Sequence, residues 1–200
     1  MRHILSALGL ITALVATTQT IEEIDKLKVD ILENLDQYER LDYENNKILN
    51  ENAHQYDSAN FYQDSNGDLV YMRWQSRGHT FHISGDDIDI IEFVFIDGKA
   101  VFRKDFGYYF KNPQWHLEPD INETEVFVAE SIRRYFNKDG SAIMDYESRT
   151  TEGKYKDRFT LLDSIPLEEV RRLIWTDRCD ECIEEDYLSI YRKLLEEKGE

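Results

Sequence analysis

The first part of the chain carries apolar residues at the spacing of a helix. Between residues 20 and 43 they recur at steps of three and four positions, which places them on one helical face. They are Ile21, Ile24, Leu27, Ile31, Leu35, Tyr38 and Leu41. Thr20 followed by Glu23 has the spacing of a capping box, a side-chain arrangement that begins helices. The pattern predicts a helix over residues 20–43, whose apolar face packs on a sheet or, alternatively, on a second copy of itself.

The middle of the chain repeats one short pattern. Aromatic and apolar residues lead into a turn that ends in Gly, and a second apolar run follows. The turns are Asn66-Gly67, Asp97-Gly98 and Asp139-Gly140. Tight hairpin turns need positive φ angles, so these dipeptides between apolar runs predict β-hairpins. The three Gly positions are separated by 31 and 42 residues, which is too irregular for a propeller or a solenoid.

These hairpins predict a β-meander over residues 59–147. The preceding residues 45–57 are polar and indicate a connector, with an edge strand at residues 47–49 as an alternative. After residue 161 the apolar spacing becomes helical again and predicts helices over residues 164–196. The fold class expected is α+β: an antiparallel β-meander sheet of roughly six to eight strands, packed by the N-terminal helix and C-terminal helices. Residues 17–200 form a single domain in this interpretation.

The first residues have the composition of an export signal. Met1-Arg2-His3 is a short basic start, residues 4–16 are apolar, and residues 17–20 are polar. This length is typical of a signal peptide and is short for a bilayer span. We expect a signal peptide at residues 1–16, with its end uncertain to residue 20, and a periplasmic or secreted protein with no transmembrane helix after its removal. An uncleaved anchor or a buried helix is the alternative.

The charge balance limits the partners. The formal net charge is −17, and an acidic surface repels phosphate groups. Nucleic acid and anionic membranes are therefore not expected partners. A basic protein or peptide fits the charge, and a glycan stacked on exposed aromatic residues is the other candidate. Solubility alone also explains an acidic surface.

Two of the hairpin phrases carry a resemblance. They run from Glu130 to Gly140 and from Phe93 to Phe102, and they have the form aromatic, Asp-Gly-Lys or Lys-Asp-Gly, apolar. They resemble a diffuse set of uncharacterised exported bacterial proteins of the Bacteroidetes type, many of them lipoprotein-like. The resemblance implies export and an α+β or all-β body, and it implies no activity. The chain departs from the lipoproteins because no Cys follows its apolar N-terminal run.

Cys179 and Cys182 form the sharpest local motif, a C-x-x-C pair. Such a pair indicates redox catalysis, half of a zinc site or a disulfide. A structural zinc site needs about four protein ligands, and the chain has no second C-x-x-C. The acidic neighbours oppose the low thiol pKa that redox catalysis needs. In an exported protein we expect a disulfide, and we predict no metal and no cofactor.

A loop between strands holds the candidate binding residues Trp115, His116 and Glu118. An aromatic ring beside a His and a carboxylate suits a binding patch or an acid/base pair, although a plain surface loop has the same composition. Upstream, Asp86-Asp87-Ile88-Asp89 lacks the ligand spacing of an EF-hand and indicates a solvated turn.

No catalytic residue is assigned, because none of the common hydrolase, metalloprotease or nucleotide-binding motifs occurs. The function expected is therefore a non-enzymatic binding or inhibitory protein of the bacterial envelope. A hydrolase that uses carboxylates with His116 is one alternative, and a structural or assembly protein is another.

Overall fold

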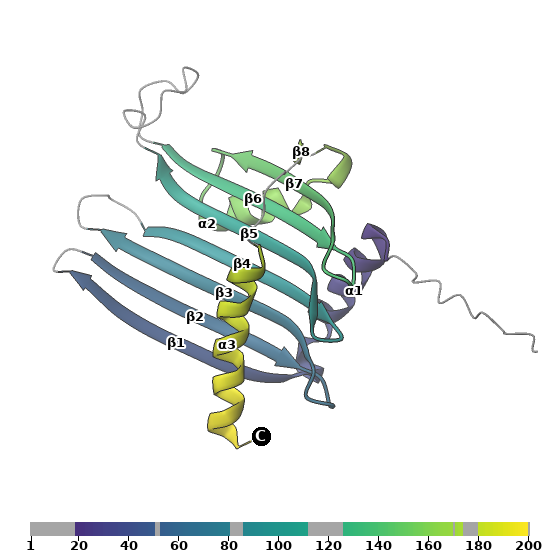
Figure 1. Cartoon of the computed structure of the whole chain (residues 1–200). Helices are drawn as coiled ribbons and strands as arrows, with labels where there is room; N and C mark the ends of the chain where they lie inside the picture. The colour runs from purple at the N-terminus through teal and green to yellow at the C-terminus, as the bar shows by residue number, and fades with distance from the viewer. Residues whose placement is uncertain are drawn as a thin grey trace, which may run out of the picture.

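A single antiparallel sheet dominates the protein (Figure 1). The computed structural model describes residues 19–50, 53–80, 86–111, 126–169, 171–173 and 180–199. Within these ranges the strands follow one another in chain order across an eight-stranded sheet. They are β1 (Glu39–Asn50), β2 (Ala53–Gln63), β3 (Leu69–Thr80), β4 (Asp86–Ile96), β5 (Lys99–Lys111), β6 (Val126–Phe136), β7 (Ala142–Thr150) and β8 (Arg171–Leu173). The predicted α+β class and antiparallel β-meander are confirmed.

Three α-helices cover the two faces of this sheet. The helix α3 (Asp180–Lys198) crosses one face, which we call the front face, whereas α1 (Ile21–Glu33) and α2 (Tyr155–Ser164) lie on the other, the back face (Figure 1). Under α3 the front face is apolar and includes Phe61, Met72 and Phe93. On the back face α1 and α2 cover separate apolar clusters. None of the helices in the described ranges is both long and apolar enough to cross a membrane.

The three Gly turns connect strands as expected, but they are of two kinds. Asp97 and Gly98 both have positive φ, 51° and 74°, which defines the two-residue type I′ hairpin turn. The other two turns share a longer form. The backbone N–H of Asp64 donates to Asp68 O at 2.9 Å, and that of Asn137 donates to Ser141 O at the same distance. In these longer turns only the Gly residue has positive φ.

The N-terminal helix begins as predicted and ends earlier. The Glu23 N–H donates to Thr20 Oγ1 at 3.2 Å, and the Thr20 N–H donates to the Glu23 carboxylate at 2.8 Å, which completes the capping box. The prediction of a helix as far as residue 43 is wrong, because α1 stops at Glu33 and a short 3-10 turn, η1 (Leu35–Gln37), follows. The chain then pairs with β2 from Glu39 onward. This pairing outweighs the helical pattern, since propensity is a weak prior.

The polar residues from Asn45 to Asp57, predicted as a connector, belong instead to the paired strands β1 and β2 wherever the structure describes them. β1 is an edge strand that pairs with β2 along most of its length, so the alternative of an edge strand is confirmed and is longer than residues 47–49. A polar edge strand is expected physically, because its outer side chains face water and discourage pairing with other chains.

The C-terminal helices also differ from the prediction over residues 164–196. α2 ends at Ser164, and a 3-10 turn, η3 (Leu167–Glu169), and the short strand β8 follow it. β8 pairs with β7 and so satisfies backbone groups at that edge of the sheet. Of these C-terminal elements, only α3 corresponds to a predicted helix. The predicted signal peptide at residues 1–16 lies outside the described residues.

Charged side chains lie on the back face between α1 and α2, and we call Arg73, Glu92, Lys104 and Asp163 the back-face ion cluster. Glu92 accepts a hydrogen bond from the Tyr71 hydroxyl at 3.0 Å and one from Arg73 at 3.2 Å. Lys104 is 3.8 Å from Glu92 and also pairs with Asp163 of α2. The Lys104 side chain is only 4% exposed, so its charge is balanced within the protein.

Candidate ligand-binding site

The front face changes from apolar to polar along the strands. Where α3 covers it, β2, β3 and β4 present Phe61, Met72 and Phe93, which lie opposite one another in the sheet. Each of these strands has a second residue on the same face four positions away, toward the same end of the sheet. These residues are Asp57, Ser76 and Asp89. Gly107 of β5 is opposite Asp89 and continues the line. We call these four residues the polar row.

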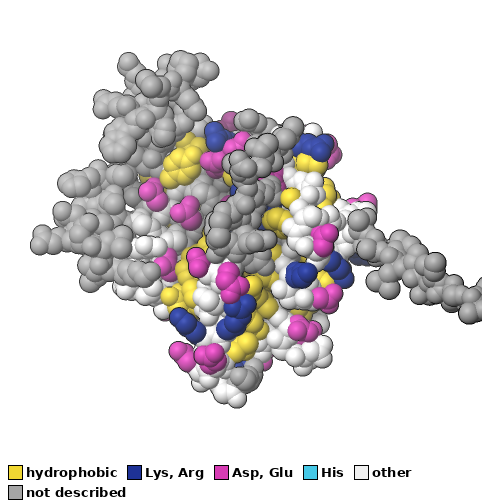
Figure 2. Space-filling model, viewed as in Figure 1, with side chains coloured by type: hydrophobic (Ala, Val, Ile, Leu, Met, Phe, Trp, Pro, Cys, Tyr) yellow, Lys and Arg dark blue, Asp and Glu magenta, His cyan; other side chains and the backbone are white. Residues whose placement is uncertain are grey.

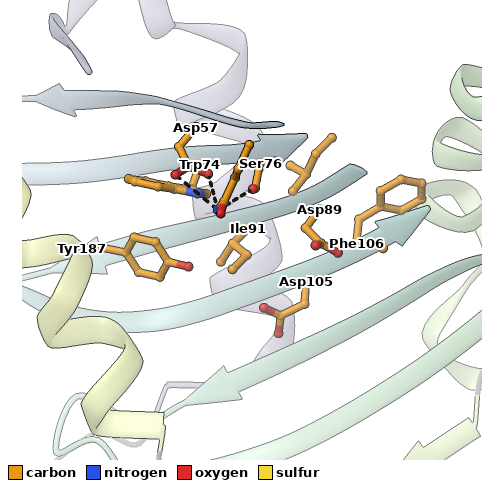
Figure 3. A pocket seen from close by; sticks show the side chains of 11 residues that line it. Asp57, Trp74, Ser76, Asp89, Ile91, Asp105, Phe106 and Tyr187 are labelled. Carbon is orange, nitrogen blue, oxygen red and sulfur yellow. Dashed lines mark hydrogen bonds between the residues drawn. The ribbon is translucent and has the colours of Figure 1, made fainter. Parts of the chain in front are cut away.

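The polar row lines a cavity of about 370 Å³ beside α3 (Figure 3). Tyr187 extends from α3 over the sheet and forms one wall together with Trp74. The two ring centres are 5.0 Å apart, and the planes are inclined by 55°. Burial raises the pKa of Tyr187 to about 12, so its hydroxyl keeps its proton near neutral pH. The cavity therefore combines aromatic walls with a polar floor.

Asp57 is held in place by a neighbouring amide rather than by a cation. Gln55 Nε2 donates to both of its carboxylate oxygens, at 3.0 and 3.4 Å, and also reaches Ser76 Oγ at 3.3 Å (Figure 3). Asp57 is 3% exposed. No ion pair joins it to any residue in the described part of the chain. A buried carboxylate without a cation is unusual, because burial disfavours its charge.

Asp89 also lines the cavity, and unlike Asp57 it is an exposed residue. Its pKa is raised, first because burial disfavours the charged form and then because Asp87 and Asp105 repel it. A Cβ atom at Gly107 would be 3.4 Å from Asp89 Oδ1, an ordinary contact distance, so Gly107 lies directly beside this carboxylate. Among the described residues Asp89 also has no ion pair.

Asp105 is the third carboxylate of the cavity, and it is compensated. Arg103 donates to its Oδ1 through Nε at 2.9 Å and Nη2 at 2.7 Å, and Arg134 donates to its Oδ2 at 2.5 Å. These charge-assisted bonds fix the Asp105 side chain. The excess negative charge of the cavity therefore comes from Asp57 and Asp89.

The site residues predicted from the sequence are not among the described residues that line this cavity. Trp115, His116 and Glu118 lie outside the described residues, as does Cys179, and the structure says nothing of the Cys182 side chain. The disulfide thus stays a prediction. The expected solvated turn at Asp86–Asp89 is wrong, because these residues form the start of β4 and pair with β3.

A comparison of the chain with protein-family models, with curated proteins and with solved structures gave no match. In the described part of the chain, no group of three or more His, Cys, Asp or Glu side chains is arranged to hold a metal ion. The chemistry of the cavity therefore has to be argued from its own residues.

Proposed function

We propose that the protein is an exported binding protein whose front-face cavity takes a positively charged group, such as the amine or guanidinium of a basic peptide or protein. One observation carries the proposal: Asp57 and Asp89 line the same cavity, and neither has a cationic partner among the described residues. Export rests on the N-terminal sequence alone. The acidic net charge of −17 would draw a basic partner toward the protein.

The charge balance supports a cation rather than an uncharged ligand. Two opposite unit charges 4 Å apart attract by about 1 kcal/mol in water and by about 4 kcal/mol near a protein surface. A ligand cation between Asp57 and Asp89 would gain such attraction from both. It would also relieve the repulsion that Asp87 and Asp105 exert on Asp89.

The aromatic wall suits the remainder of such a ligand. A Lys or Arg side chain carries its charge on an apolar stem, and the faces of Trp and Tyr attract both the stem and the charge. Trp74 and Tyr187 offer these surfaces beside the carboxylates.

Titration calorimetry with three small probes tests the proposal. The probes are the N-acetyl amides of lysine, arginine and norleucine, of which norleucine has an apolar stem without the charge. We expect binding of a charged probe at least about tenfold tighter than that of norleucine, a difference of about 1.4 kcal/mol. Asp89→Asn should remove most of this preference, because it removes one carboxylate from the cavity.

The matched control is Asp36→Asn, which removes the same charge from an exposed residue of η1. It should leave the affinity unchanged. Equal binding of lysine and norleucine probes, or equal losses in the two variants, would contradict a cation site at the polar row.

A further inference from the structure

We propose that the cavity takes the guanidinium group of an arginine side chain in a peptide or protein, held over Gly107 and beside Asp89. The inference rests on the proposed function, a cation site at the polar row, and deepens it by naming the cation and its place. It starts from the front face of β5. Successive residues on that face are Arg103, Asp105, Gly107 and Tyr109.

Asp105 shows which cation this face of the sheet already takes. Arg103 donates two hydrogen bonds to Asp105 Oδ1, and Arg134 donates one to Oδ2. The Arg103 guanidinium also lies over the ring of Phe93, with its Cζ atom 5.4 Å from the ring centre. A carboxylate and an aromatic ring thus hold this guanidinium, and both contacts suit a planar cation with several N–H donors.

The space over Gly107 has the same two kinds of neighbour. Gly107 follows Asp105 by two positions, as Arg103 precedes it by two, and it lies opposite Asp89. A Cβ atom on Gly107 would be 3.4 Å from Asp89 Oδ1 and 3.6 Å from the ring of Tyr109. Gly107 also lines the cavity. A glycine inside a strand often marks a place where a ligand approaches the backbone closely. A ligand guanidinium over Gly107 would therefore reach a carboxylate and an aromatic ring.

Asp89 favours a guanidinium over an ammonium group. In the described part of the chain no residue donates a hydrogen bond to Asp89, so both of its oxygens can accept one. A guanidinium offers two parallel N–H groups to such a carboxylate, whereas an ammonium group is a strongly hydrated point charge. Figure 3 shows Tyr187 across Ile91 from Asp89, so the apolar arginine stem can lie over Ile91. Asp57, two strands from Asp89, attracts the cation at longer range.

The acidic surroundings favour an arginine within a peptide over free arginine. In the view of Figure 2, exposed Asp and Glu side chains lie on both sides of α3. Free arginine carries a carboxylate, which such a surface repels. An arginine inside a peptide chain has no carboxylate of its own and keeps the guanidinium.

Titration calorimetry on the full chain tests the cation. The probes are the N-acetyl amides of arginine, lysine and citrulline, together with free arginine. Citrulline has nearly the shape of arginine without its charge. We expect the arginine amide to bind about tenfold or more tightly than the lysine and citrulline amides, the worth of one charge-assisted hydrogen bond. Free arginine should bind more weakly than its amide, and tighter binding of free arginine would contradict a peptide ligand.

Gly107→Arg tests the place, because it supplies the protein's own guanidinium there. Gly107 does not have a positive φ, so its backbone accepts a side chain. The variant should bind the arginine amide at least about tenfold more weakly, and it should unfold at a higher temperature than Gly107→Met, whose side chain is also long but uncharged. Asp36→Asn, which changes the net charge by the same amount at an exposed residue, should bind like the wild type.

The outcomes separate this inference from the proposed function. If the lysine and arginine amides bind equally and both bind tighter than the norleucine amide, the arginine assignment is wrong and cation binding stands. If neither binds tighter than norleucine, both are wrong. Wild-type affinity in Gly107→Arg, or equal stability of Gly107→Arg and Gly107→Met near neutral pH, would overturn the place over Gly107. Circular dichroism identifies any variant that does not fold, and the probe comparison needs no variant.

Discussion

Two acidic residues on opposite faces of β4, Glu92 and Asp89, have different electrostatic environments. Glu92 points to the back face, where Tyr71, Arg73 and Lys104 surround it. Asp89 is three residues earlier and lies on the front face, where its nearest charged neighbours are other carboxylates. Glu92 is thus paired with cationic side chains, whereas Asp89 is repelled by the carboxylates of Asp87 and Asp105.

This difference separates charges that support the fold from charges that are available to a ligand. A buried ion pair is costly to break, since removal of one partner leaves a charge without compensation. The back-face ion cluster has this property and links the sheet to α2 through Lys104 and Asp163. Carboxylates held in repulsion lower stability and are retained where function needs them. The comparison therefore favours the polar row, and not the back-face ion cluster, as the candidate functional site.

The largest effect is expected from Lys104→Met. This change keeps the length of the side chain and removes the cation between Glu92 and Asp163. We expect a loss of about 2–3 kcal/mol in the free energy of unfolding, below the full cost of breaking a buried pair because Arg73 and Tyr71 still contact Glu92. Urea denaturation measures it.

Lys138→Met is the control for that change. Lys138 pairs with Asp97 at 3.3 Å, but both side chains are exposed, at 51% and 82%. Exposed pairs contribute about 0–1 kcal/mol. A loss in Lys104→Met no larger than that in Lys138→Met would break the distinction between the two faces.

A smaller effect is expected from Tyr71→Phe. The Tyr71 side chain is buried, and its hydroxyl donates to Glu92 at 3.0 Å. Phe fills the same volume without the donor, so the change tests the hydrogen bond alone. We expect a loss of about 1 kcal/mol in the free energy of unfolding and no change in binding of the lysine probe. Tyr62→Phe, on the neighbouring strand, is the control: its ring packs 5.7 Å from that of Tyr71, but the hydrogen bond that it loses is to the exposed Arg40 and should cost less. Weaker probe binding in Tyr71→Phe would show that the two faces are coupled.

Much of this fold could be predicted from the sequence because its strongest signals are local. Asn-Gly and Asp-Gly turns need only a few residues to define them, and the Thr20 and Glu23 capping box needs four. The end of α1 was not predictable in the same way. Leu35 and Tyr38 continue the apolar spacing and still pack on the back face with α1, yet they belong to the turn and the link that lead into β1. Their conformation follows from the pairing of the next residues with β2, which starts with Glu39 opposite Gln63.

The candidate site was missed for a related reason. The sequence places Asp89 in a solvated turn, and even as a strand residue between Ile88 and Ile90 it looks like an ordinary solvent-facing side chain. Its importance comes from its alignment with Ser76 and Asp57, which depends on the register of three strands. Three aligned polar residues and a glycine, on a face that is apolar elsewhere along the same strands, are a signal only when the strand pairing is known.

The smallest effect, and the one of opposite sign, is expected from Asp89→Asn. Because the pKa of Asp89 is raised in the folded protein, its ionised form destabilises the fold. The wild type therefore loses stability as the pH rises from the usual Asp pKa of about 3.9 through the raised value. Asn carries no charge, so the variant should be more stable than the wild type near neutral pH, by about 0.5 kcal/mol or less because solvent screens the site. Below the usual pKa the two proteins should be equally stable. Thermal unfolding of both proteins across this pH range, with Asp36→Asn for reference, measures the difference. A variant that is less stable than the wild type at neutral pH would place Asp89 among the charges that support the fold.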